Sequence, residues 1–162
     1  MKKIPALLIT FFVWAAAHAQ SVGRADLEKI TGQWTGSLTY LDYTSNKPET
    51  VQASLEVSMK NKTVFMFAYS YPNEPGRGGK EKFKLSENGS KINNMKVIER
   101  IEQPEGGYKI VLEEKGKDGN EGRTAIFRHI FEKKDQQLTI TKMVKFEGTD
   151  DFFQRNQYQF KR

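Results

Sequence analysis

Hydrophobic and polar residues alternate along most of this chain, which is the pattern of half-buried β-strands. Residues 50–59 show it most clearly, since Val51, Leu55 and Val57 fall on one face and Gln52 and Glu56 on the other. The same period of two predicts nine strands, at residues 33–43, 50–59, 63–71, 80–86, 92–101, 108–114, 123–133, 138–146 and 152–161.

The breaks between these strands are short and rich in Asn, Gly, Pro and Asp, which favour tight turns. No amphipathic helix of ten residues or more separates any two strands, so parallel pairing through crossover helices is excluded. Residues 24–31 predict one short helical turn before the first strand. The pattern therefore predicts an all-β fold, an antiparallel up-and-down meander barrel of about eight to ten strands.

The first twenty residues interrupt this pattern and predict an export signal that is removed. Lys2 and Lys3 precede an apolar run, and Ala17-His18-Ala19 has the small-x-small pattern of a signal peptidase site. We therefore expect residues 1–20 to be removed and residues 21–162 to form a single domain, periplasmic or secreted. The chain has no cysteine, which excludes disulfides, thiolate metal sites and a lipid-modified N-terminal Cys.

Charge narrows the range of partners. Loss of Lys2 and Lys3 lowers the net charge from +6 to +4 (6 − 2), and the remaining lysines are spread along the sequence. A nucleic-acid-binding protein concentrates its cations on one face, so no nucleic acid partner is expected. We expect no stable membrane insertion after the signal is removed, and a monomer or a weak homo-oligomer.

The most specific motif lies where the first strand begins. Residues 27–36 read LEKITGQWTG, and this short helical turn followed by Gly-x-Trp resembles the opening of the lipocalins and the wider calycin group. The resemblance implies a lipocalin-like barrel, of a bacterial secreted kind, in which Gly32 and Trp34 close one end. It also implies a cation from the last strand packed on the Trp34 ring. Arg155, Lys161 and Arg162 are the candidates for that cation, and we expect Arg155.

Aromatic residues supply the candidates for a ligand site. Phe65, Phe67, Tyr69 and Tyr71 share one face of a strand and either line a cavity or fill the core. The other candidates are Phe127, His129 and Tyr158. His129, the one histidine after residue 20, shares a face with Phe127, and an imidazole among aromatic residues also suits an axial haem ligand.

No catalytic motif is present, and the sequence does not predict an enzyme. With one His and no Cys after residue 20, a zinc site would need carboxylates for its remaining ligands, so no metal site is expected. No cofactor is expected either, with haem as the more distant alternative. The expected function is the binding of a small apolar or amphipathic molecule in the barrel. The alternative is a non-catalytic interaction or structural module of the cell envelope with a filled barrel.

Overall fold

The computed structural model describes residues 21–42, 44–45 and 47–162, so the expected signal at residues 1–20 lies outside the described residues. It contains one five-residue helix, α1 (Arg24–Glu28), and a single turn of 3₁₀ helix, η1 (Pro104–Gly106). The strands are β1 (Gly32–Asp42), β2 (Lys47–Met59), β3 (Val64–Ser70), β4 (Gly79–Lys84), β5 (Lys91–Ile92), β6 (Met95–Glu102), β7 (Tyr108–Lys117), β8 (Thr124–Lys134), β9 (Gln137–Phe146) and β10 (Phe153–Lys161).

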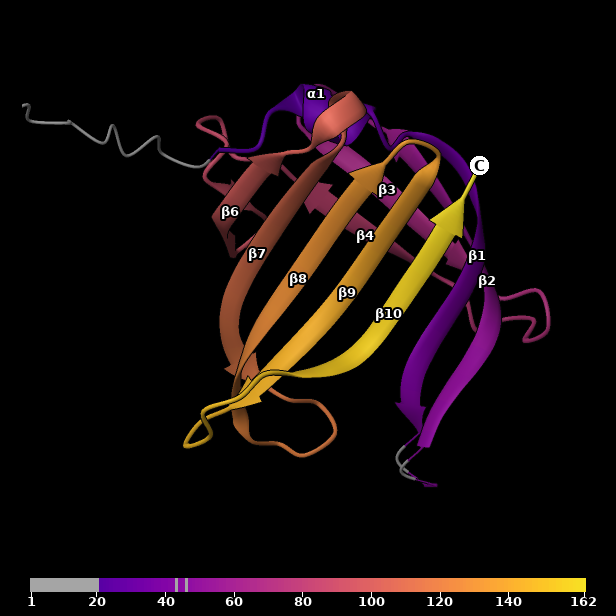
Figure 1. The fold of residues 1–162 in the computed structure, drawn as a ribbon, viewed down its shortest axis with the longest axis vertical. Helices are drawn as coiled ribbons and strands as arrows, with labels where there is room; N and C mark the ends of the chain where they lie inside the picture. The colour runs from indigo at the N-terminus through magenta and orange to yellow at the C-terminus, as the bar shows by residue number, and fades with distance from the viewer. Residues whose placement is uncertain (1–20, 43, 46) are drawn as a thin grey trace, which may run out of the picture.

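All ten strands belong to one antiparallel sheet with the order β4-β3-β2-β1-β10-β9-β8-β7-β6-β5. The sheet curls into a nearly closed barrel, with α1 across one end and the β7–β8 and β9–β10 loops at the other (Figure 1). The predicted all-β up-and-down meander is confirmed. We call the end beneath α1 the closed end and the opposite end the open end.

The predicted strand at 92–101 is in fact two strands, because the chain turns between Ile92 and Met95. Asn93 has a φ of 54°, a left-handed conformation that asparagine tolerates better than most residues. Its side chain also bonds to β4, the strand at the other edge of the sheet. It accepts a 2.8 Å bond from the Lys84 N–H and donates one of 2.8 Å to the Lys82 carbonyl. With the single bridge between Leu85 and Ile92, Asn93 thus joins β4 to the β5–β6 hairpin.

The closed end is built around Trp34, whose side chain is buried and whose indole N–H donates a 2.8 Å bond to the Ile30 carbonyl. Gly32 has a φ of +110°, a conformation that L side chains rarely adopt, and this explains the glycine of the Gly-x-Trp motif. The guanidinium over the Trp34 ring belongs to Arg162, at 4.4 Å from the ring centroid. Arg162 also donates bonds of 2.7 and 3.0 Å to the carbonyls of Thr31 and Lys29.

The choice of Arg155 as the partner of Trp34 was therefore wrong. In the β1–β10 register Thr35 pairs with Lys161 and Tyr40 pairs with Asn156. The residue beside Trp34 is consequently the last of the chain, whereas Arg155 lies near the open end. This register is set by pairing between the first and last strands, which leaves no periodic signal in the sequence.

A buried ion pair fixes α1 to the barrel wall. Asp26 is 4% exposed, accepts a 2.9 Å bond from the Gly23 N–H and receives two bonds of 2.9 and 2.8 Å from Arg100 on β6. Burial alone raises the pKa of the Asp26 carboxyl, but the bonds from Arg100 and Gly23 together bring it below its ordinary value. The carboxylate is therefore part of the structure that closes this end.

Replacement of Arg162 by Ala is expected to lower the free energy of unfolding by about 1 kcal/mol, the contribution of an exposed cation–π contact and charge-assisted bonds. Urea denaturation followed by Trp fluorescence measures it. Lys161→Ala, which removes an exposed neighbouring cation, is the control and should cost much less. Equal losses in the two variants would contradict the assigned role of Arg162.

Replacement of Asp26 by Asn is expected to lower the free energy of unfolding at neutral pH by about 3 kcal/mol, since it removes the buried carboxylate that accepts two charge-assisted bonds from Arg100. Because the folded-state pKa of Asp26 lies below the unfolded value, this stabilisation exists above the unfolded pKa and is lost as pH falls through the folded one. The difference between wild type and Asp26→Asn should accordingly shrink in acid. Asp151→Asn, at an exposed position, is the control, and a pH-independent difference would contradict the account.

Candidate functional site

The closed half of the barrel interior is filled by side chains. Phe65 and Phe67 are 0% exposed, and the rings of Phe67 and Phe83 lie 4.3 Å apart between centroids. Trp34, Leu55 and Tyr108 belong to the same core. Of the aromatic residues suggested for the ligand site, Phe65 and Phe67 are thus core residues and line neither of the cavities described below.

Next to this core, on the side of the open end, lies an inner cavity of about 150 Å³, with walls from β3, β4, β8, β9 and β10. It contains three of the residues suggested from the sequence, Tyr69, His129 and Tyr158, which come from three different strands. The full lining is Tyr69, Glu81, Phe83, His129, Phe131, Ile140, Lys142, Asn156 and Tyr158. More than half of these side chains carry a polar group, so the cavity is a polar compartment within the barrel.

His129 is uncharged near neutral pH. Its side chain is 23% exposed, and its Nε2 lies 4.0 Å from the Oε1 of Glu114. Burial, together with the positive charge of Lys142, lowers the pKa of His129 to about 4. The contact with Glu114 therefore joins a neutral imidazole to a carboxylate.

Lys142 and Glu81 bring opposite charges into the inner cavity. Lys142 pairs across the sheet with His129 on one side and Asn156 on the other. Its Nζ lies 4.8 Å from the centroid of the Phe127 ring, a distance at which the ring face attracts a cation. Glu81 is exposed to solvent, but burial of part of its side chain raises the pKa of its carboxyl, an effect that the charge of Lys142 opposes.

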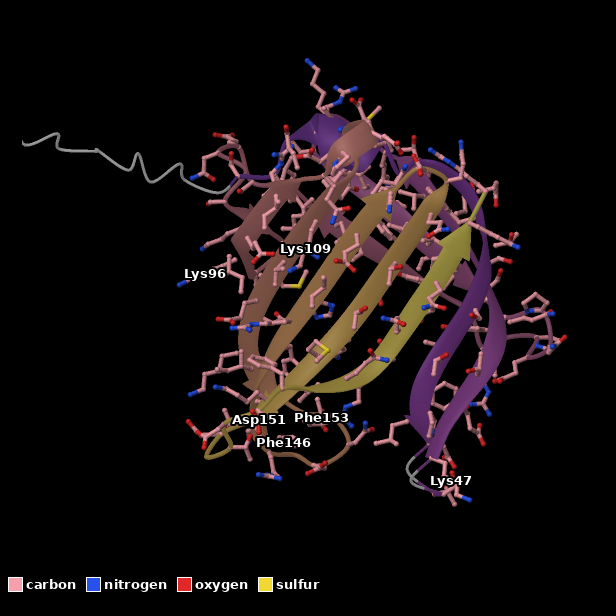
Figure 2. The ribbon with its side chains drawn as sticks, viewed as in Figure 1. Lys47, Lys96, Lys109, Phe146, Asp151 and Phe153 are labelled. Atoms are coloured by element: carbon pink, nitrogen blue, oxygen red, sulfur yellow. The ribbon has the colours of Figure 1, made fainter. Side chains whose placement is uncertain are left out.

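Phe127 does not line the inner cavity, and its link to that cavity is the contact of its ring with Lys142. It packs with Ala125, Val144, Phe146 and Phe153 in a small second cluster. Figure 2 shows Phe146 and Phe153 near the β9–β10 turn, at the open end of the barrel. The polar layer of the inner cavity therefore separates two apolar clusters.

A second cavity of about 390 Å³, which we call the mouth cavity, opens beside β1 and β2. Its apolar wall consists of Leu38, Leu41 and Val51. The other lining residues are Tyr40, Tyr71, Glu74, Arg77, Asn120, Arg155 and Asn156. This cavity is the place of Tyr71, the fourth aromatic residue of the predicted stripe.

The two cavities adjoin each other at two places. Asn156 lines both of them. The hydroxyls of Tyr71, in the mouth cavity, and Tyr158, in the inner cavity, share a hydrogen bond of 2.7 Å. The Tyr158 ring also lies 5.0 Å from that of Tyr69, between centroids. A tyrosine hydrogen bond thus stands between the compartments.

Arg155 lines the mouth cavity and forms an ion pair with Asp118 there. Its Nη2 lies 2.7 Å from the Oδ2 of Asp118, and both side chains are buried. Asp118 in turn accepts bonds of 3.0 Å from the backbone N–H groups of Asn120 and Glu121. This arrangement fixes the β7–β8 loop against the rim of the mouth cavity.

Sequence reasoning missed Glu81 and Lys142. Lys142 had a signal, because it interrupts the apolar face of residues 138–146, and Glu81 had a weaker one on the face shared with Phe83. A charged residue on an otherwise inward face is a candidate for a functional site, since burying a charge needs compensation.

Metal sites and membrane-spanning helices are absent from the part of the chain that the structure describes. Among residues 21–42, 44–45 and 47–162, no group of three or more His, Asp or Glu side chains is placed to hold a metal ion. Within the same ranges, no helix has the length and hydrophobicity needed to cross a membrane.

Comparison with known proteins finds similarity among solved structures. No protein-family model matches the chain, and no curated protein matches it. Among solved structures, the chain is similar to the fluorescent protein UnaG: the wild type has 14% identity and a TM-score of 0.43 over 84% of this chain and 98% of that one. Two point mutants of UnaG give 15% and 16% identity with TM-scores of 0.43 and 0.44. In each case the comparison covers 84% of this chain and 97% of the mutant.

The imidazole of His129 is expected to titrate with a pKa of about 4. NMR of the protons bound to its ring carbons, recorded as a function of pH, measures this pKa. His129→Gln assigns the resonance. Removal of the nearby charge in Lys142→Met should raise the pKa, whereas Lys145→Met, on the opposite face of β9, should leave it unchanged. An ordinary histidine pKa in the wild-type protein would contradict the buried position of His129.

Proposed function

We propose that this protein binds a small amphipathic molecule in the open half of its barrel. The single observation that carries the proposal is the pair of adjoining cavities, one with an apolar wall and one with a polar lining. Ligand cavities of proteins usually combine apolar walls with a few polar groups that orient the ligand. The expected export signal supports a site of action outside the cytoplasm, in the periplasm or beyond the cell.

The volumes of the two cavities support a ligand whose apolar part lies in the mouth cavity and whose polar part lies in the inner cavity. The mouth cavity of about 390 Å³ falls in the range of about 300–1,000 Å³ that is typical of small-molecule sites. The inner cavity of about 150 Å³ is below it and suits a small polar group. Haem has the bulk of a large ligand, so the space beside His129 argues against an axial role for this residue.

The alternative of a filled interaction module has less support. The large core fills the closed half of the interior, whereas the open half holds only the small second cluster around Phe127. Among the described residues, the large hydrophobic side chains that are exposed are Met59, Ile98 and Ile101. They lie on β2 and β6, which are not neighbours in the sheet, so they do not suggest one extended apolar docking surface.

Filling the mouth cavity tests the proposal. Val51 lines this cavity, and the next residue, Gln52, is exposed. Val51→Trp is expected to weaken binding of the fluorescent probe anilinonaphthalene sulfonate by about tenfold or more, equivalent to about 1.4 kcal/mol. Gln52→Trp adds the same ring outside the barrel and should leave the affinity unchanged.

Unfolding by urea shows whether each variant keeps its fold. Equal affinities in the wild type, Val51→Trp and Gln52→Trp would contradict binding in the mouth cavity. Absence of probe binding to the wild type would remove the support for a ligand-binding barrel.

A further inference from the structure

The inner cavity is rich in hydrogen-bond donors. Burial raises the pKa of Tyr69 and of Tyr158, so both hydroxyls stay protonated and are able to donate. Asn156 adds an amide, neutral His129 adds one ring N–H, and Lys142 adds an ammonium group. Glu81 is the one acidic side chain of the lining.

Lys142 is the cation of this cavity, and the protein balances its positive charge only in part. None of the ion pairs within 4.0 Å in the described part of the chain includes Lys142. Its one close charge-stabilising contact there is the face of the Phe127 ring. A cation held among donors, next to a cavity, is suited to an anionic group of a ligand.

We propose that the inner cavity is a proton-coupled subsite for the carboxylate of an amphipathic acid, in which Lys142 binds the anion and Glu81 takes up a proton when the anion enters. The inference rests on the proposed function and adds the chemical class and the orientation of the ligand. The carboxylate lies innermost, and the apolar tail extends into the mouth cavity along Leu38, Leu41 and Val51.

The size and position of the cavities fix this orientation. About 150 Å³ holds a head group and a few carbon atoms but not a whole amphipathic molecule. The tail must then pass Asn156, which borders both cavities, and displace the hydrogen bond between Tyr71 and Tyr158. With the head group in place, either tyrosine hydroxyl is free to donate to it.

The role of Glu81 follows from the charges around it. Lys142 on β9 is the cation that faces it, His129 on β8 is neutral with Glu114 on β7 beyond it, and Tyr69 and Tyr158 stay uncharged. Burial already raises the pKa of Glu81, and a second carboxylate beside it raises this pKa further. Binding therefore takes up a proton, and the affinity for the anion falls as pH rises from the pKa of Glu81 in the free protein to its higher pKa in the complex.

The experiment compares decanoate with decanol, which has the same tail and no charge, by isothermal titration calorimetry on the full domain. Lys142→Met is expected to weaken decanoate binding by about tenfold or more and to weaken decanol binding much less, because decanol carries no charge. Lys145→Met is the matched control, because Lys145 is on the same strand, faces outward and also contacts an aromatic ring. Lys142→Arg keeps the charge and should restore the preference for decanoate.

The proton is measured in the same titrations. Calorimetry at one pH in two buffers with different protonation enthalpies should show net proton uptake on decanoate binding by the wild type and none on decanol binding. Glu81→Gln should abolish the uptake and bind decanoate more tightly, because the carboxylate that opposes the anion is gone. An uptake that persists in Glu81→Gln would overturn the role of Glu81.

The remaining outcomes separate this inference from the proposed function. Equal affinities for decanoate and decanol, or equal effects of Lys142→Met and Lys145→Met, would overturn the anionic subsite while leaving a ligand-binding barrel in place. If the wild type binds neither compound, both the inference and the proposed function fail.

Discussion

Burial of Trp34 beneath α1 is the interaction on which the remainder of the structure depends. Its indole bonds to the Ile30 carbonyl and its ring lies under the guanidinium of Arg162, so the beginning and the end of the barrel meet at one residue. The β1–β10 register then places Phe160 opposite Gly36 and Tyr158 opposite Leu38. Because strand register is fixed in steps of two residues for a given face, closure at Trp34 also determines which side chains of β10 reach the open half.

The second constraint is the polar layer across the barrel interior. A continuous apolar interior would pack shut, as the closed half does around Phe65 and Phe67. Lys142, His129 and Asn156 lie side by side on β9, β8 and β10, where the solvation of these polar groups competes with packing. The inner cavity lies where this polar layer interrupts the core. The packed core and the cavity therefore both follow from the alternation of residues along neighbouring strands.

The sequence predicted the fold better than the site. Period-two alternation and short turns were enough for an antiparallel meander, because both signals are local. The two-residue strand β5 was missed, since its turn at Asn93 depends on one left-handed residue and on bonds to β4. Arg155 was preferred to Arg162 because the register of β1 with β10 is set by pairing between strands far apart in the sequence.

The same reasoning applies to the site. Tyr69, His129 and Tyr158 were identified as inward aromatic or imidazole groups, and the structure brings them to one cavity. Phe65 and Phe67 have the same alternation but lie nearer the closed end of the barrel. The alternation shows which face a residue is on, but it does not show how far along the barrel axis the residue lies. Glu81 and Lys142 come from strands at different positions in the sheet, so only the closed barrel brings their charges close together.

A crystal structure of the protein grown with decanoate is the most direct test of the central claim, that the open half of the barrel is a ligand site. The account predicts electron density for the tail along Leu38, Leu41 and Val51, and for the carboxylate beside Lys142. An open half filled by the protein's own side chains, with no density for the acid inside the barrel, would contradict it.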